Sequence, residues 1–283
     1  MAHQPTQGYP SLSKSYKGMY PFKLATTSFI YPDHYVPNVK LVGPFVDEIE
    51  LLLFESGPAE SLLPRSVIED LIHLSRDLSL TYNIHLPTDI SIGDFSAARQ
   101  QQAVDTLIRI VEQTMPLSPT AYTLHIPFGD IISDPNAISR RQDKVYRNLE
   151  KMLTAGIPGD LLAVETLDYP LEIIDKILSE LNLAVCMDIG HLIVHGIEIQ
   201  SVFNQYCDKV AIIHLHGVEG HQDHLALNRI SEEWLGPVFD ILNRFLGSVS
   251  LEVFSFENLS GSLKYLERIW NKKYPDNYCQ TCK

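Results

Sequence analysis

The sequence has few cysteines, a shortage of basic residues and no long apolar run. Its 283 residues include 4 Cys and 22 Lys plus Arg against 35 Asp plus Glu, so the formal net charge is −13. A surface this acidic repels phosphate backbones, so a DNA or RNA partner is not expected. No segment approaches the roughly 20 apolar residues of a membrane span, and residues 1–18 lack the apolar core of a signal peptide. We therefore expect a cytoplasmic protein without a membrane partner.

The small number of cysteines and the absence of two common motifs exclude further classes of protein. The cysteines are too few for a disulfide scaffold, and Cys279 and Cys282 form a lone C-x-x-C in the C-terminal tail, to which we assign no role. The segment after the first apolar run reads TTSFIYPD and contains no Gly-rich phosphate loop, and no G-x-S-x-G occurs. An open nucleotide-binding sheet and a serine hydrolase are therefore disfavoured.

Eight short apolar runs alternate with amphipathic segments along the chain. The runs cover residues 22–29, 48–55, 80–86, 121–126, 161–167, 183–189, 210–216 and 249–255. Apolar residues at helical spacing predict helices over residues 65–78, 96–114, 137–154, 171–180, 232–245 and 261–272, with shorter ones after the first and sixth runs.

Repeated strand–helix units, with strands apolar enough to be buried on both faces, predict an α/β fold. We expect a closed (β/α)8 TIM barrel, and an open doubly wound sheet is the alternative. No linker divides the chain. We expect a flexible arm over residues 1–20, a single barrel domain over 21–274 and a tail over 275–283.

Histidines and acids recur where the predicted strands end. In a (β/α)8 barrel these ends and the following loops form the active site. The residues at these positions are His85, His125, Glu165, Asp188, His191, His214, His216, Asp223, His224 and Glu252. Imidazole and carboxylate together suit zinc, manganese or iron, and clustered buried carboxylates need compensating cations. The sequence therefore predicts a divalent metal centre at the barrel mouth.

Some neighbouring positions are more ambiguous. His214 and His216 lie on the same face of one strand, and we choose His216 as the ligand because it is nearer the strand end. His214 is then expected to support a ligand or to pack. Glu55 could contact substrate or cap its loop, whereas Glu48 and Glu50 are expected deep in the barrel. Three histidines in predicted loops or helices are expected to be non-ligands: His34, His73 and His195.

With these positions placed, the chain resembles the xylose isomerase-like barrel superfamily, which also contains metal-dependent abasic-site endonucleases. The quartet that sugar isomerases and epimerases use for metal is matched by Glu165, Asp188, His216 and Glu252. The histidines that the endonuclease branch adds are matched by His85, His125 and His191. That branch also has an Asp-x-His after the seventh strand. Here Gln222 stands two residues before His224 and Asp223 adjoins it, which puts a third metal centre in doubt.

The segments KLATTSFIYPDHYVPNVKLVGPFVDEIELLLFE, TYNIHLPTDI, MDIGHL and HLHG followed by DHLAL resemble cobamide-remodelling phosphodiesterases of this superfamily. The resemblance implies hydrolysis of the nucleotide-loop phosphoester of a corrinoid, with two or three ions of zinc, manganese or iron. One ion would be held by His85, His125 and Glu165, a second by Glu165, Asp188, His216 and Glu252, and a third by His191, Asp223 and His224.

Glu165 and Glu252 are the expected catalytic residues, with Glu165 as the bridge between two ions. Two alternatives stay open. One is a sugar isomerase or epimerase with one divalent ion, in which the same two glutamates serve as acid and base. The other is a non-catalytic barrel that binds a corrinoid or a metal. The sequence predicts no oligomeric state.

Overall fold

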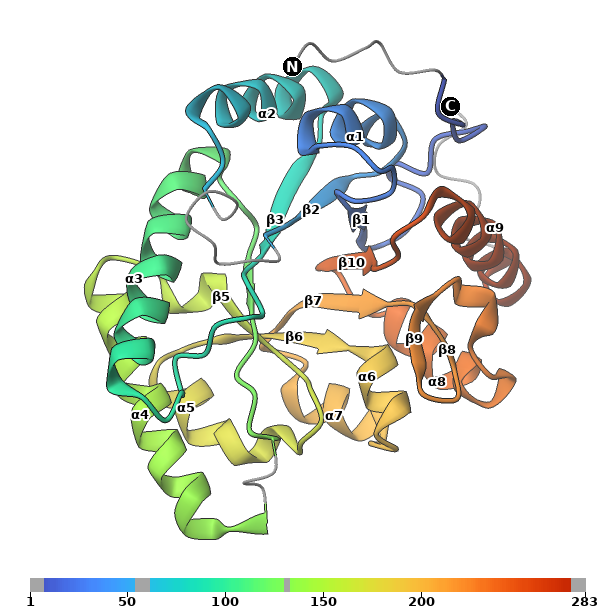
Figure 1. The fold of residues 1–283 in the computed structure, drawn as a ribbon. Coiled ribbons are helices and arrows are strands. Elements are labelled where there is room, and N and C mark those ends of the chain that lie inside the picture. The colour runs from blue at the N-terminus through green and yellow to red at the C-terminus, as the bar shows by residue number, and fades with distance from the viewer. Residues whose placement is uncertain (1–7, 54–61, 130–132, 276–283) are drawn as a thin grey trace.

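A computed structural model describes residues 8–53, 62–129 and 133–275 of the chain (Figure 1). Eight parallel strands close into a barrel in the spatial order β1-β10-β7-β6-β5-β4-β3-β2, which confirms the predicted (β/α)8 TIM barrel. The strands are β1 Lys23–Thr27, β2 Glu48–Leu52, β3 Thr81–His85, β4 Tyr122–Leu124, β5 Leu162–Glu165, β6 Ala184–Asp188, β7 Val210–Leu215 and β10 Ser248–Leu251.

Each strand lies within or overlaps one of the eight predicted apolar runs. The strands are buried almost throughout, because barrel side chains fill the inner side and helices cover the outer side. The parallel register places Asp188 beside His214 on neighbouring strands and Thr27 beside Glu50. The ends of β3, β5 and β6 therefore carry polar residues to the same mouth of the barrel.

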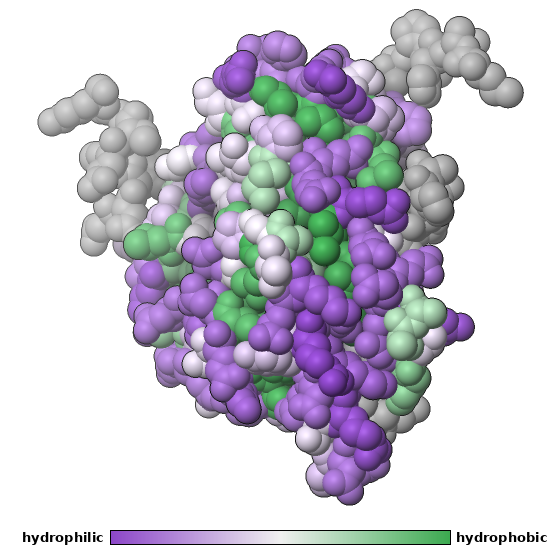
Figure 2. Space-filling model, turned by 90° about the vertical axis from the view of Figure 1, so that its left-hand side faces the viewer, coloured by the Kyte–Doolittle hydropathy of each residue, from purple (hydrophilic) through white to green (hydrophobic). Residues whose placement is uncertain are grey.

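Helices follow the strands and cover the barrel. They are α1 Tyr35–Val42, α2 Arg65–Leu78, α3 Ala97–Thr114, α4 Pro135–Thr154, α5 Asp175–Glu180, α6 Ile189–Val194, α7 Ile199–Tyr206, α8 Glu232–Leu242 and α9 Phe256–Lys273. Their inner faces are apolar, while hydrophilic residues cover most of the side over α3 and α4 (Figure 2). Among the described residues, no helix is both long and apolar enough to cross a membrane.

Side-chain caps fix where several helices begin. Ser96 accepts a hydrogen bond from the Arg99 amide at the start of α3. Ser255 does the same for the Asn258 amide, so α9 begins at Phe256 rather than at the predicted residue 261. The predicted helix over 171–180 is a 3-10 turn followed by α5.

A short antiparallel hairpin after β7 was not predicted. It consists of β8 Gly217–Glu219 and β9 Gln222–Leu225, joined by a turn in which Gly220 has a φ of 65°. The two strands are too short and too polar to show a period of two in the sequence. This hairpin carries Asp223 and His224 to the barrel mouth.

Part of the segment expected to be a flexible arm, residues 1–20, packs against the barrel. Tyr16 and Tyr20 are buried in the hydrophobic core. The Tyr20 ring stacks on Phe22 at 5.0 Å and meets the edge of Trp270 at 5.2 Å. These aromatic contacts hold the segment against the barrel although most of its residues are polar. Residues 1–7 and the Cys279 and Cys282 pair lie outside the described residues.

Candidate metal centre

The carboxyl ends of the barrel strands bring acids and histidines to one opening. β3 ends at His85, β5 at Glu165 and β6 at Asp188, while Glu252 directly follows β10. Glu165 is 1% exposed and Asp188 is fully buried. Buried carboxylates at this density require hydrogen bonds or cations close by.

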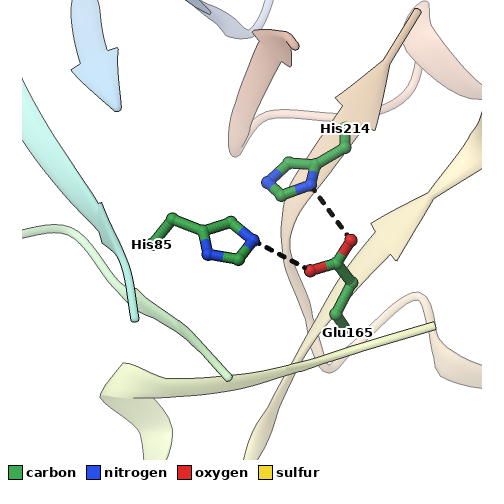
Figure 3. A group of neighbouring side chains, drawn as sticks. All are labelled: His85, Glu165 and His214. Carbon is green, nitrogen blue, oxygen red and sulfur yellow. Dashed lines mark hydrogen bonds and ion pairs between the residues drawn. The ribbon is translucent and has the colours of Figure 1, made fainter. Parts of the chain in front are cut away.

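Glu165 lies at the centre of this group. One of its oxygens, Oε2, lies 2.6 Å from Nε2 of His125 and 3.2 Å from Nε2 of His85. The other, Oε1, lies 3.4 Å from Nδ1 of His214 and 3.5 Å from Nδ1 of His191. Figure 3 shows the His85 ring directed at one of the two oxygens and the His214 ring at the other. A carboxylate placed in this way can bridge two cations.

His214 is held with one ring nitrogen facing the acids. Its Nε2 lies 2.9 Å from Oε1 of Glu50, and Ser250 donates its hydroxyl hydrogen bond to the other oxygen of that glutamate. Nε2–H therefore donates to Glu50, and the lone pair of Nδ1 faces the centre. Nδ1 is 3.0 Å from Oε2 of Glu252 and 3.7 Å from Oδ2 of Asp188.

The arrangement of these ligand atoms is better satisfied with a bound cation than without one. Nδ1 of His214 and Oε2 of Glu252 are both buried, and neither has a hydrogen-bond partner among the described residues. Single ligand atoms of Glu165, Asp188, His214 and Glu252 all lie within 4.8 Å of one another, and the same holds for His85, Glu165 and His214. A divalent ion between these atoms would satisfy the two unpaired ones and offset the carboxylate charge.

His216 lies beside this group with a different set of contacts. Its Nε2 is 3.2 Å from Oδ1 of Asp188. Its Nδ1 accepts a hydrogen bond from the backbone amide of His224 and also lies 3.3 Å from the carbonyl oxygen of Gly217. The amide favours a proton on Nε2, while the carbonyl favours a proton on Nδ1 and a free Nε2. Only the second tautomer leaves His216 ready to bind metal through Nε2.

A third group lies at the outer edge of the mouth. His191, Asp223 and His224 place one ligand atom each within 4.8 Å of one another, all partly exposed. His224 has a φ of 52°, which is unusual for a residue other than glycine and is typical of functional sites. The adjacent Asp223 and His224 thus converge even though the spacing differs from Asp-x-His.

Burial and mutual charge set the protonation of the metal-free centre. Burial lowers the pKa of His85 and His216, but neighbouring Glu165 and Asp188 outweigh it and raise both values to about 9. Burial raises the pKa of Glu252, yet the charge of His214 brings it down to about 2. The carboxylates of the centre are therefore ionised near neutral pH, and its imidazoles hold protons more tightly than a free histidine does. Metal ions would replace those protons.

The structure brings together the sequence-predicted ligands, namely His85, His125, Glu165, Asp188, His191, His216, Asp223, His224 and Glu252. The placement of His214 and His216 differs from the expectation. His214, expected to pack or to support a ligand, occupies the place among three carboxylates that was given to His216. β7 ends at Leu215, so His214 lies on the last inward-facing strand position and His216 already belongs to the loop.

The remaining candidate acids and histidines lie outside the ligand groups or outside the described residues. Glu50 lies deep in the barrel as expected, but its contact with His214 was missed because strand pairing across the barrel is not visible in a single sequence. Glu48 is buried with Asn83 and Thr81. None of the ligand groups above includes the exposed His34, His73 and His195. Glu55 lies outside the described residues.

Comparisons with known proteins give a likeness of fold. No family model and no curated protein sequence matches the chain. Among solved structures, a D-tagatose 3-epimerase-like protein is 18% identical over 89% of this chain and 99% of its own, with a TM-score of 0.73. An L-ribulose 3-epimerase is 14% identical over 93% and 99%, with a TM-score of 0.70. Endonuclease IV from Thermus thermophilus is 16% identical over 89% and 99%, with a TM-score of 0.66. The chain therefore shares the TIM-barrel fold of these proteins.

Proposed function

We propose that this xylose isomerase-like barrel is a metal-dependent phosphodiesterase. The observation that carries the proposal is the position of Glu165, whose two oxygens face histidines on both sides, His85 and His125 at one and His191 and His214 at the other. A site for one ion would not need ligands on both sides of the same carboxylate. Paired ions a few ångströms apart are typical of phosphoester hydrolysis.

The residues divide into three sets for two or three divalent ions, with zinc or manganese preferred and iron as an alternative. The first set is His85, His125 and Glu165; the second is Glu165, Asp188, Glu252 and a β7 histidine, His214 by geometry; the third is His191, Asp223 and His224. When bound, such ions activate water for attack on phosphorus and stabilise the departing oxygen. His216, which contacts Asp188, and Glu252, which contacts His224, are also placed to hold or pass a proton.

The proposed substrate is a corrinoid, cleaved at its nucleotide-loop phosphoester. This part rests on the resemblance of the sequence segments around β1, β3, β6 and β7 to cobamide-remodelling phosphodiesterases. The net charge of −13 is compatible with it, because one phosphodiester on a large small-molecule ligand needs no extended basic groove.

A sugar isomerase or epimerase is the second candidate. Two of the similar solved structures described above are an epimerase and an epimerase-like protein, and this favours it. Glu165, Asp188, a β7 histidine and Glu252 would hold one ion, and the two glutamates would exchange protons with the sugar. This candidate leaves His85 and His125 without a role.

Metal counting and product analysis distinguish the two candidates. We expect purified protein loaded with zinc or manganese to contain two or three ions per chain and to hydrolyse a cobamide, detected by mass spectrometry. One ion per chain, with conversion of a ketose and no phosphoester cleavage, would instead establish the epimerase.

Glu165→Gln tests the bridging carboxylate. It should remove metal and hydrolysis together, since one carboxylate serves two sets of ligands. The matched control is Glu48→Gln, at a buried glutamate of the same barrel outside the ligand sets, which should keep both. Wild-type hydrolysis by Glu165→Gln would refute the assignment.

A further inference from the structure

An aromatic hollow lies beside the candidate metal centre. It is formed by the segments that follow β1 and β10 together with Tyr9 of the N-terminal segment, and it has a volume of about 600 Å³. Its main lining residues are Tyr9, Phe29, Ile30, Tyr31, Phe254 and Phe256. Both segments leave the carboxyl ends of their strands, so the hollow opens on the same face of the barrel as the ligand sets.

Phe254 joins the hollow to the metal centre. It stands two residues after Glu252, and its ring centroid lies 5.1 Å from that of His224. It is also 40% exposed, which is unusual among the large apolar side chains of the described chain. A large apolar ring that is left in water at a functional opening gains free energy when a ligand covers it.

The hollow offers ring faces rather than hydrogen bonds. Tyr31 lies between Tyr9, at a centroid distance of 4.8 Å, and Phe256, at 5.9 Å. The hydroxyls of Tyr9 and Tyr31 already donate to the carbonyl oxygens of Pro32 and Pro10. None of the described lining residues is Lys or Arg. The charged residue among them is Glu257, whose carboxylate would repel a phosphate, whereas a flat aromatic ring would stack.

We propose that this hollow is a subsite for a planar aromatic group of the substrate. The inference deepens the proposed phosphodiesterase function and rests on it. The phosphoester lies at the metal centre, and an aromatic ring of the same molecule stacks on Phe254, the exposed ring of the hollow. The substrate class is then a phosphodiester that carries a planar aromatic group within reach of His224. A simple sugar does not satisfy this description.

Binding of indole to the full-length protein tests the subsite without the reaction. Indole is flat and has no nitrogen lone pair for a metal, and cyclohexanol is the non-aromatic comparison. Ligand-observed NMR should show saturable indole binding that Phe254→Ala weakens by roughly fivefold to a hundredfold, since a stacked ring contributes on that scale. Cyclohexanol should bind much more weakly.

Phe95→Ala is the matched control, because Phe95 is 76% exposed and does not line the hollow. It should leave indole binding unchanged, and circular dichroism should show that both variants are folded. Phe29→Ala is a second variant that should weaken binding in the same direction. Equal indole affinity in the wild type, Phe254→Ala and Phe29→Ala would overturn the inference.

Hydrolysis of bis(p-nitrophenyl) phosphate separates this inference from the proposed function. Phe254→Ala should raise KM for this aromatic diester and change KM for dimethyl phosphate little. If indole binds as expected but no phosphodiester is cleaved, the proposed function fails and the aromatic subsite stands. If phosphodiesters are cleaved and indole does not bind, the subsite fails and the function stands.

Discussion

The ring of His214 determines what the barrel mouth can bind. Its Nε2–H is engaged by Glu50, so Nδ1 presents a lone pair to Glu165, Asp188 and Glu252. A carboxylate behind a histidine fixes the tautomer and raises the basicity of the opposite nitrogen. Glu50 therefore acts on the centre through His214 and is not a member of any ligand set itself.

Glu50→Gln should weaken metal binding by roughly tenfold to a hundredfold, which is the usual effect of losing such a supporting carboxylate. The amide can keep the shape of the contact but cannot stabilise a basic imidazole equally. Affinity is measured by competition with a chromophoric zinc chelator. Glu48→Gln is the matched control, since Glu48 lies on the same strand but contacts Asn83 and Thr81. Equal affinities for the two variants would argue against this role of Glu50.

The metal-free protein should lose stability as the pH rises toward 9. The pKa values of His85 and His216 are raised from 6.5 to about 9, so their contribution is complete below pH 6.5 and disappears through pH 9. Glu252, with its pKa lowered from 4.5 to about 2, stabilises above pH 4.5 and loses this effect as the pH falls through 2. Stability from these groups is therefore greatest between about pH 4.5 and 6.5.

Thermal melts of chelator-treated protein between pH 5 and 9.5 check this expectation. Zinc affinity should rise over the same interval, because ligands must release protons to bind metal. The exposed His73→Gln variant should follow the wild-type profile. A melting temperature that rises from pH 6.5 to 9 would contradict the assigned interactions.

Single residues were partly predictable from the sequence. Apolar runs in the sequence indicate where strands end. Glu165 is the last residue of β5 and Asp188 the last of β6, so the positions of both acids could be predicted from the apolar pattern alone. The choice between His214 and His216 could not be predicted in this way. It depends on the residue at which β7 stops pairing with β6 and β10, and a shift of one residue changes the answer. The contact of Glu50 with His214 could not be predicted, because β2 and β7 are not neighbouring strands and meet only through side chains inside the barrel.

At the scale of elements, the turn from β6 into α6 combines three functions in four residues. Asp188 ends the strand, caps α6 by accepting a hydrogen bond from the His191 amide, and faces the metal centre. Gly190 between them has no side chain, and the His216 ring packs against it. A β-carbon there would lie 1.9 Å from Cε1 of His216.

Gly190→Ala should therefore push His216 away from Asp188. We expect a loss of roughly 1–3 kcal/mol of stability from overpacking and a reduced metal content. Gly236→Ala in α8 is the control, since a β-carbon there meets no atom within 4 Å and alanine favours a helix. Thermal melts and metal analysis compare the two variants. Wild-type metal content and stability in Gly190→Ala would show that His216 can move without consequence.

Most elements were predictable because each has a strong periodic pattern, as in α2, which spans the predicted residues 65–78. The β8 and β9 hairpin was not, since its strands have three and four residues and no apolar alternation. Its position follows from contacts with α6 and from the His224 amide donating to His216. Tertiary contacts of this kind leave no local signal in a sequence.

At the scale of the whole molecule, the closed barrel explains how four acids can meet in its interior. Glu50, Glu165, Asp188 and Glu252 come from β2, β5, β6 and the end of β10, which are distant in sequence. Closure places them around one axis, each with a histidine as partner. An open sheet with these strands would leave β1 and β10 as its two edge strands and would spread the same acids along one side.

Closure also needs the bottom of the barrel to be covered, and the N-terminal segment contributes to that. Tyr16 and Tyr20 precede β1 and are buried, and the amide of Gly18 donates to Asp47 just before β2. Tyr20, with Phe22 and Trp270, ties the segment to α9, the last helix. The segment thus connects the two ends of the chain across the seam between β1 and β10.

Tyr20→Ala should consequently destabilise the whole barrel rather than the segment alone. Removing a largely buried aromatic ring costs about 3 kcal/mol, and the barrel is expected to unfold as one unit, so its melting temperature should fall by several degrees. Tyr20→Phe keeps the ring contacts with Phe22 and Trp270 and should melt close to the wild type. Differential scanning calorimetry follows both variants. A melting temperature of Tyr20→Ala equal to that of the wild type would mean that the N-terminal segment lies on the barrel without stabilising it.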